Sequence, residues 1–248
     1  MTTKNKLPEL LLAFWVMKIC ATTLGETGGD MLSMTLNIGY TYTSILLLTI
    51  FAISLALQMS AKRYEPLKYW FVILSTSTAG TTMSDFLDRT LGLGYATGAA
   101  LLSSLLVAIL LVWKLTEKSL SVVDVHSRRA EAFYWAAILV SNTLGTALGD
   151  YLADDSGLGF AGGALLIGSL IAVVVALHRF TPISKVALFW AAFVLTRPFG
   201  ATFGDFMTKP IEKGGLNLGT VGSSAVLLTI LVVLVYKEHH RHRPVKAA

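Results

Sequence analysis

The chain has 248 residues, of which 54% are hydrophobic and only 14% are charged, and its mean hydropathy is +0.66. A soluble domain usually carries about 25% charged residues, so this composition excludes a disordered chain and an ordinary cytosolic enzyme. The single cysteine, Cys20, excludes an internal disulfide and a cysteine-based zinc or iron–sulfur site. The net charge of +5 does not indicate nucleic-acid binding, because the basic residues gather in loops between apolar segments.

Eight segments are apolar over enough residues to cross a bilayer core, which takes roughly 20 residues. In chain order they cover approximately 8–30, 43–60, 68–87, 95–114, 131–151, 160–178, 185–206 and 218–237. Lys4 and Lys6 precede the first segment as in a signal peptide, but Lys18 interrupts it and no small-residue cleavage motif follows. We therefore expect an all-α integral membrane protein with eight transmembrane helices and a retained first span.

The basic residues predict how these spans are oriented. Eight spans place both termini on one side, and the segments on that side carry fifteen Lys and Arg residues. The opposite loops carry only Arg89, Lys209 and Lys213. Because Lys and Arg favour the cytoplasmic side, we expect cytoplasmic termini. The tail 238–248, which begins EHHRHR, is more typical of a basic cytoplasmic segment beside lipid than of a metal-binding tract.

One motif occurs four times, as LGETGGD (24–30), AGTTMSD (79–85), LGTALGD (144–150) and FGATFGD (199–205). In each copy a glycine precedes an aspartate by five positions, and the residue just before the aspartate is small. The aspartates follow one another at spacings of 55, 65 and 55 residues. A second glycine follows nine positions after the first three aspartates and fourteen after the last, at 39, 94, 159 and 219. The sequence thus predicts one membrane domain, 1–248, built from four repeats at approximately 8–62, 66–118, 131–180 and 185–237.

Each repeat holds two spans, so all four repeats share one orientation and are parallel. The four motif aspartates, Asp30, Asp85, Asp150 and Asp205, should therefore lie near the outer face around a pseudo-fourfold axis. The Gly-x-x-x-small pattern by itself is typical of close helix packing. The aspartates could simply cap the following loops, but ionised groups at membrane depth by default indicate a pathway or a site.

Further acids accompany the motif aspartates. Glu26 lies four residues before Asp30, so the two side chains can share one helical face. Asp88 and Asp154 follow their aspartates by three and four residues, which suits a second, outer ring. All five histidines fall on the cytoplasmic side, so a zinc or copper site among these acids is disfavoured. Carboxylate and hydroxyl oxygens favour a hard cation such as Mn²⁺, Mg²⁺ or Ca²⁺.

Four residues inside the spans could support this metal site. Thr22, Asn142 and Arg197 each stand eight positions before a motif aspartate, and Lys18 stands two turns before Glu26. Thr22 and Asn142 would add oxygen ligands. Arg197 is expected to face the bundle interior and pair with an acid, whereas Lys18 either does the same or extends toward the interface. Such pairs could replace a cation in an empty site, which suits an exchanger better than an open pore.

The stretch from Lys18 to Asp30, with its LGETGGD core, resembles a family of uncharacterised bacterial membrane-anchored proteins. The likeness extends over the whole chain and implies a location in the bacterial inner membrane but no activity. A looser likeness links the chain to manganese/calcium exporters with E-x-G-D repeats. Here Glu26 and Asp30 are one residue further apart, no Lys or Arg follows the aspartate, and the other three motifs lack the glutamate.

The first functional hypothesis is a secondary transporter or exporter of a hard metal cation, Mn²⁺ before others, coupled to protons or another ion. Its metal site would consist of Glu26, Asp30, Asp85, Asp150 and Asp205. The alternatives are a cation channel with an outer ring of aspartates and a non-transport scaffold or sensor. No Walker loop, HExxH or nucleophile elbow occurs, so we expect no enzyme and no cofactor. The expected partners are the cation and membrane lipid, without nucleic acid, and a homo-oligomer is left open.

Overall fold

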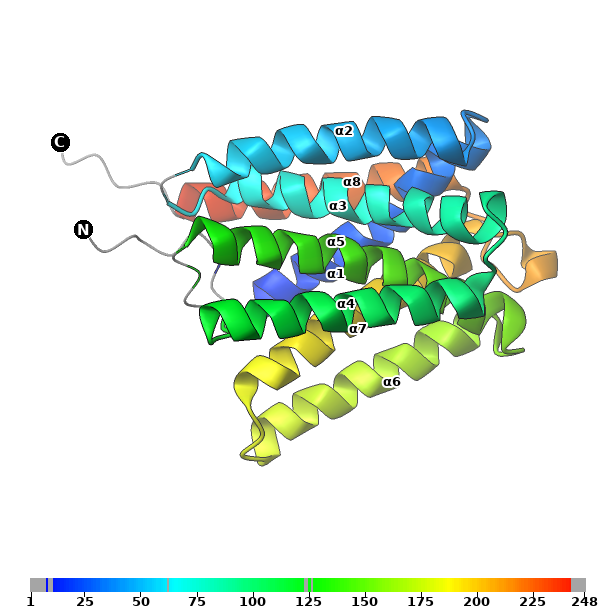
Figure 1. The fold of residues 1–248 in the computed structure, drawn as a ribbon. Coiled ribbons are helices and arrows are strands. Elements are labelled where there is room, and N and C mark those ends of the chain that lie inside the picture. Colours follow the sequence, from blue (N-terminus) through cyan, green and yellow to red (C-terminus); the bar gives the residue numbers. More distant parts are fainter. Residues whose placement is uncertain (1–7, 9–10, 62, 123–124, 126, 242–248) are drawn as a thin grey trace.

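The computed structural model describes residue 8 and residues 11–61, 63–122, 125 and 127–241. Eight long helices dominate this part of the chain (Figure 1). They are α1 (Leu12–Asp30), α2 (Tyr40–Met59), α3 (Pro66–Asp85), α4 (Tyr95–Glu117), α5 (Arg128–Asp150), α6 (Gly159–Phe180), α7 (Lys185–Thr208) and α8 (Thr220–Arg241). The predicted all-α architecture is confirmed, and the helices begin and end within four residues of the predicted bounds.

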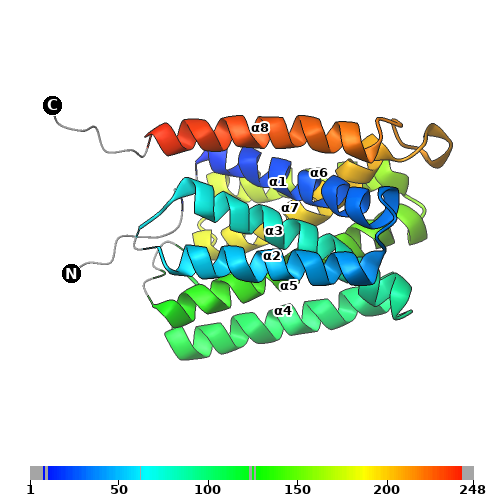
Figure 2. The same cartoon turned by 90° about the horizontal axis from the view of Figure 1, so that it is seen from above.

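The four odd-numbered helices form an inner ring. Each packs against the next, and the contact between α7 and α1 closes the ring. The even helices lie outside, and each packs mainly on the odd helix of the following repeat: α2 on α3, α4 on α5, α6 on α7 and α8 on α1 (Figure 2). The repeats therefore run parallel, with α1 beginning at the end of the bundle where α8 stops (Figure 1). We call the end of the bundle where α1 begins and α8 stops the terminal end, and we call the opposite end the aspartate end.

Five of the described helices, α2, α4, α6, α7 and α8, are long and apolar enough to cross a membrane. The other three, α1, α3 and α5, are less apolar because they turn small and polar residues into the inner ring. In α3, for example, Ser75, Thr76 and Ser77 are all buried. Their lower hydropathy therefore accompanies an inner position that other helices cover. The five apolar helices are compatible with a multi-pass membrane protein.

The second glycine of each repeat starts the outer helix. Gly39, Gly94, Gly159 and Gly219 all have a positive φ, between 66° and 82°. Residues with a Cβ rarely adopt this conformation, so glycine is needed where the chain reverses toward α2, α4, α6 and α8. In the first three repeats a single π-helical turn follows the motif aspartate: η1 (Met31–Thr35), η2 (Phe86–Thr90) and η3 (Tyr151–Asp155). The fourth repeat instead has a longer loop with a short 3₁₀ turn, η4 (Ile211–Lys213).

A ring of aromatic side chains closes the inner bundle toward the terminal end. Each odd helix carries two adjacent aromatic residues: Phe14 and Trp15, Tyr69 and Trp70, Tyr134 and Trp135, Phe189 and Trp190. Ring centroids pair between neighbouring repeats at 5.6 Å for Phe14 with Trp70, 5.6 Å for Tyr69 with Trp135, 6.3 Å for Tyr134 with Trp190 and 5.8 Å for Trp15 with Phe189. Tilted and edge-on pairs of this kind stabilise packing beyond their buried area.

Candidate cation-binding site

The first glycine of each motif allows the inner helices to approach closely. A Cβ atom on Gly80 would lie 2.9 Å from the Cβ of Asn142, and one on Gly200 would lie 2.8 Å from the Cβ of Thr22. Gly25 in the first repeat meets the next helix in the same way. Only a hydrogen fits at these positions, which explains the glycine in each motif.

Thr22 and Asn142 are therefore packing partners of these glycines. The Thr22 hydroxyl donates to the Thr196 carbonyl at 3.1 Å, and the Asn142 amide donates to the Thr76 hydroxyl at 2.9 Å. Among the described residues, neither side chain bonds to one of the acids. Thr22 and Asn142 therefore lie in the contacts between inner helices, closer to the terminal end than the acids are, and they do not bind the carboxylates.

The four motif aspartates lie at the aspartate end, each at or close to the last turn of an inner helix. They are buried and bridged in two pairs. Arg89 Nε lies 3.0 Å from Asp85 Oδ1, and its Nη2 lies 3.3 Å from Asp150 Oδ2. Lys209 Nζ lies 2.7 Å from Asp30 Oδ2 and 3.0 Å from Asp205 Oδ1. Each base joins two neighbouring helices of the ring through their carboxylates.

Glu26 lies one helical turn further inside and pairs with Arg197. The Arg197 Nη1 atom donates to Glu26 Oε2 at 3.1 Å, and both side chains are buried. Thr81 and Thr146 also donate to the same carboxylate oxygen, at 3.2 Å and 3.4 Å. The expected pairing of Arg197 with an acid inside the bundle is thus present.

Three of the acids come close enough to share one ion. Carboxylate oxygens of Glu26, Asp30 and Asp205 lie within 4.8 Å of one another, and all three residues are buried. They come from α1 and α7, the pair of helices at which the ring of repeats closes. Asp85 and Asp150 stand on the other two helices, where Arg89 holds them.

The charges at this end do not balance. Five carboxyl groups, on Glu26 and the four motif aspartates, face three bases, on Arg89, Arg197 and Lys209. Two negative charges remain when all eight groups are ionised. Burial alone would lower the pKa of Lys209, but the carboxylates of Asp205 and Asp30 outweigh burial and raise this pKa above its usual range. Lys209 is therefore a stable cation where it stands.

Lys18 does not join the cluster. Its side chain is wholly buried, which excludes the alternative of extension to the membrane interface. The ammonium lies 4.1 Å from the centre of the Phe193 ring, and among the described residues it has no hydrogen-bond partner. A cation over an aromatic face gains some electrostatic stabilisation there. Lys18 thus lies one helical turn before Thr22, whose carbonyl accepts from Arg197, and it contacts no acid in the described part of the chain.

Asp88 and Asp154 do not form an outer ring. Asp88 is buried, accepts from the Ser84 hydroxyl at 3.3 Å, and fills the space that a side chain at Gly98 would need. Asp154 is exposed and accepts from the Tyr95 hydroxyl at 3.3 Å. The two acids differ because Asp88 belongs to a helix contact, whereas Asp154 stands at the surface.

Arg89 and Lys209 belong to the site although the sequence suggests no such role for them. In the sequence they stand out only as basic residues of the outer loops. Each stands four positions after a motif aspartate, the spacing that places two side chains on one helical face. That spacing could have shown the pairing with Asp85 and Asp205. It could not have shown the second bridge, to an aspartate of another repeat.

Fold and site together define an all-helical repeat protein, with membrane-compatible helices and a buried, ion-paired acidic cluster at one end. Four segments, 13–64, 68–119, 133–183 and 188–243, match the family described as a repeat of unknown function, DUF347. Because the matches cover most of the chain, the protein belongs to this family. The expected kinship with an uncharacterised family agrees with this match. No curated protein and no solved structure matches the chain.

Proposed function

We propose that this protein is a secondary transporter of a hard divalent cation, with Mn²⁺ as the first candidate, in the bacterial inner membrane. In this proposal all eight helices span the bilayer, both termini are cytoplasmic and the aspartate end faces outward, as the Lys and Arg distribution favours. The inner helices can be less apolar than single spans because the even helices shield them from lipid.

The observation that carries the proposal is the group of Glu26, Asp30 and Asp205. Their carboxylate oxygens lie within 4.8 Å of one another, a spacing that one cation can bridge. With all groups ionised, the cluster carries two more negative than positive charges while Lys209 is in place and three more once Lys209 has left, so it attracts a divalent cation. Hydroxyls of Thr81 and Thr146, which contact Glu26, add oxygen donors. Oxygen-only ligands favour Mn²⁺, Mg²⁺ or Ca²⁺ over softer metals.

Lys209 supports an exchange mechanism. Its ammonium bridges Asp30 and Asp205, so it occupies a position where a bound cation would contact these carboxylates. The side chain is 21% exposed and follows the end of α7, so it can leave the site without unwinding an inner helix. We propose that the arriving cation displaces Lys209, and that carboxyl groups holding protons in the empty state release them. Transport would then be coupled to protons without ATP.

The channel alternative is less well supported. Arg197 donates to groups on three other inner helices, through Glu26 on α1, the Ser77 carbonyl on α3 and the Thr146 hydroxyl on α5. A guanidinium bonded to all three neighbours occupies the middle of the ring, where an open pore would have to pass. The scaffold alternative explains the ion pairs as structural, and the flux experiment decides between it and transport.

The test is Mn²⁺ flux into liposomes that contain the full chain. We expect flux in the wild type and a loss of at least about tenfold for Glu26→Gln and for Asp30→Asn, because each removes a carboxylate ligand. Asp154→Asn is the matched control, since it removes one exposed acid of the same end, and its flux should stay within about twofold of the wild type. Gel filtration of each variant verifies that it is folded.

Two results would contradict the proposal. One is undiminished flux in both Glu26→Gln and Asp30→Asn. The other is a wild-type protein that carries none of Mn²⁺, Mg²⁺ and Ca²⁺ under an imposed cation or proton gradient. In either case the non-transport scaffold becomes the leading function.

A further inference from the structure

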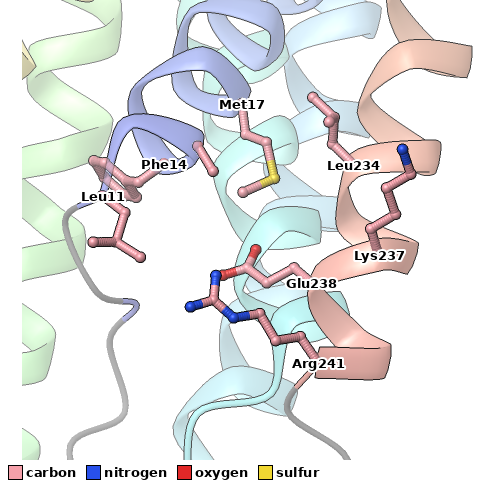
Figure 3. Close-up of a pocket in the computed structure, with 8 residues that line it drawn as sticks. Leu11, Phe14, Met17, Leu234, Lys237, Glu238 and Arg241 are labelled. Carbon is pink, nitrogen blue, oxygen red and sulfur yellow. The ribbon is translucent and has the colours of Figure 1, made fainter.

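A cavity opens at the terminal end between the start of α1 and the end of α8 (Figure 3). Its volume is about 220 Å³. The apolar part of its lining comes from Leu11, Phe14 and Met17 on the α1 side and from Leu234 on α8. Figure 3 shows these side chains on the two helices that border the cavity. Phe14 and Met17 are buried, so the apolar wall continues into the protein core.

The charged part of the lining comes from α8 alone and contains Lys237, Glu238 and Arg241 (Figure 3). Glu238 is engaged elsewhere: its two oxygens accept hydrogen bonds from the Tyr64 hydroxyl at 2.8 Å and from Trp70 Nε1 at 2.9 Å. These bonds fix the end of α8 to α3 and its preceding loop. Lys237 and Arg241 stand four residues apart, on one helical face, and form no ion pair with the described residues.

The place of the cavity in the ring is unusual. At the terminal end, chain segments connect three of the four outer-to-inner helix pairs: α2 with α3, α4 with α5 and α6 with α7. The fourth pair, α8 with α1, consists of the last and first helices, so no chain segment connects them. The cavity therefore lies where an outer and an inner helix meet at this end through non-covalent contacts, without a connecting chain segment.

We infer that this cavity binds an anionic glycerophospholipid of the surrounding leaflet, with its phosphate on Lys237 and Arg241 and an acyl chain against Phe14, Met17 and Leu234. Basic pockets between helices on the cytoplasmic side are suited to such headgroups, because the inner leaflet is rich in anionic lipid. An apolar wall beside two cations that form no ion pair with the described residues complements a molecule that joins a hydrocarbon chain to a phosphate. The bound lipid would bridge α8 to α1 where the chain does not.

This inference rests on membrane insertion with the terminal end in the cytoplasm and not on cation transport, so its test needs no flux. The full chain in a non-ionic detergent is titrated with phosphatidylglycerol, and bound lipid is counted by native mass spectrometry alongside the thermal unfolding midpoint. We expect saturable binding of phosphatidylglycerol, a rise in the midpoint, and neither effect with phosphatidylcholine.

Two variants locate the site. Lys237→Gln with Arg241→Gln should bind phosphatidylglycerol about 30-fold more weakly, since each basic group near an anionic headgroup contributes about 1 kcal/mol, which is a gain of about fivefold. Ala13→Phe, which fills the cavity and leaves both cations in place, should also abolish the rise in the midpoint. The matched control is Lys114→Gln with Lys118→Gln, which removes two charges with the same spacing from the end of α4 and should bind as the wild type does.

Several results would overturn the inference. Unchanged phosphatidylglycerol binding in both cavity variants, or equal weakening in the Lys114/Lys118 control, would show that general charge attraction holds the lipid. Full competition by millimolar inorganic phosphate would show a site for free phosphate. If binding appears only after deletion of 242–248, the natural occupant is the protein's own tail.

Discussion

The guanidinium of Arg197 is bonded to every other inner helix, which makes it the central polar group of the ring. Its Nη1 donates to the Thr22 carbonyl at 3.3 Å and to Glu26 at 3.1 Å. Its Nη2 donates to the Ser77 carbonyl at 3.2 Å and to the hydroxyls of Thr81 and Thr146. A planar group with several donors in a fixed fork can serve this many acceptors, and a lysine ammonium cannot.

Replacing Arg197 by methionine should destabilise the protein by about 3–5 kcal/mol, because it leaves the Glu26 carboxylate buried without a cation. Arg197→Lys should recover little of this loss. The double variant Arg197→Met with Glu26→Gln should be more stable than Arg197→Met alone, since it removes the orphaned charge. Thermal unfolding in detergent measures all three, and a stable Arg197→Met single variant would contradict the role assigned to the pair.

At this scale the sequence predicted part of the site. Arg197 was expected to face inward because a guanidinium in an apolar span needs an acid, and it pairs with Glu26. Lys18 interrupts a span in the same way, yet its ammonium lies over the Phe193 ring and contacts no acid among the described residues. This position was not predictable, because the sequence does not show which helix faces Lys18. The bridges made by Arg89 and Lys209 depend on which repeats are neighbours in space. Spacing along the chain does not contain that information.

Among the elements, the inner helices meet through glycine. The Cβ that Gly80 lacks would lie 2.9 Å from Asn142, whereas Gly222 on α8 has nothing within 4 Å of its missing Cβ. Gly80→Ala should therefore destabilise the protein by about 1–3 kcal/mol through overpacking. Gly222→Ala is the matched control and should be neutral or stabilising by up to about 1 kcal/mol, because alanine favours helix. Thermal unfolding would refute the packing role if both variants behaved alike.

The helices themselves were largely predictable, because long apolar segments and the fourfold motif define them in the sequence. Their pairing was not. Hydropathy shows that a helix has a lipid-compatible surface, but it does not show that α2 packs on α3 or that α8 packs on α1. The polar residues of α1, α3 and α5 were the available signal for an inner position, since small and hydroxyl side chains suit surfaces covered by protein.

For the whole molecule, the decisive prediction concerns sidedness. Lys118 follows α4 at the terminal end, and Lys213 lies in η4 at the aspartate end; both are exposed. In intact cells a membrane-impermeant maleimide should label Lys213→Cys and leave Lys118→Cys unlabelled until the cells are opened. Cys20 is buried and gives little background. Labelling of Lys118→Cys from outside would overturn the eight-span orientation.

The offset packing of outer on inner helices has a consequence for how such a protein can arise. The two helices of one repeat pack mainly on other repeats, and the outer helix covers the inner helix of the following one. A chain with a single repeat would thus have no surface of its own for its second helix, and it could build this ring only as four identical copies in cyclic symmetry. Joining four copies in one chain frees each to diverge. Glu26 in the first copy and Arg197 in the fourth, which form one ion pair, are a difference that four identical subunits could not carry.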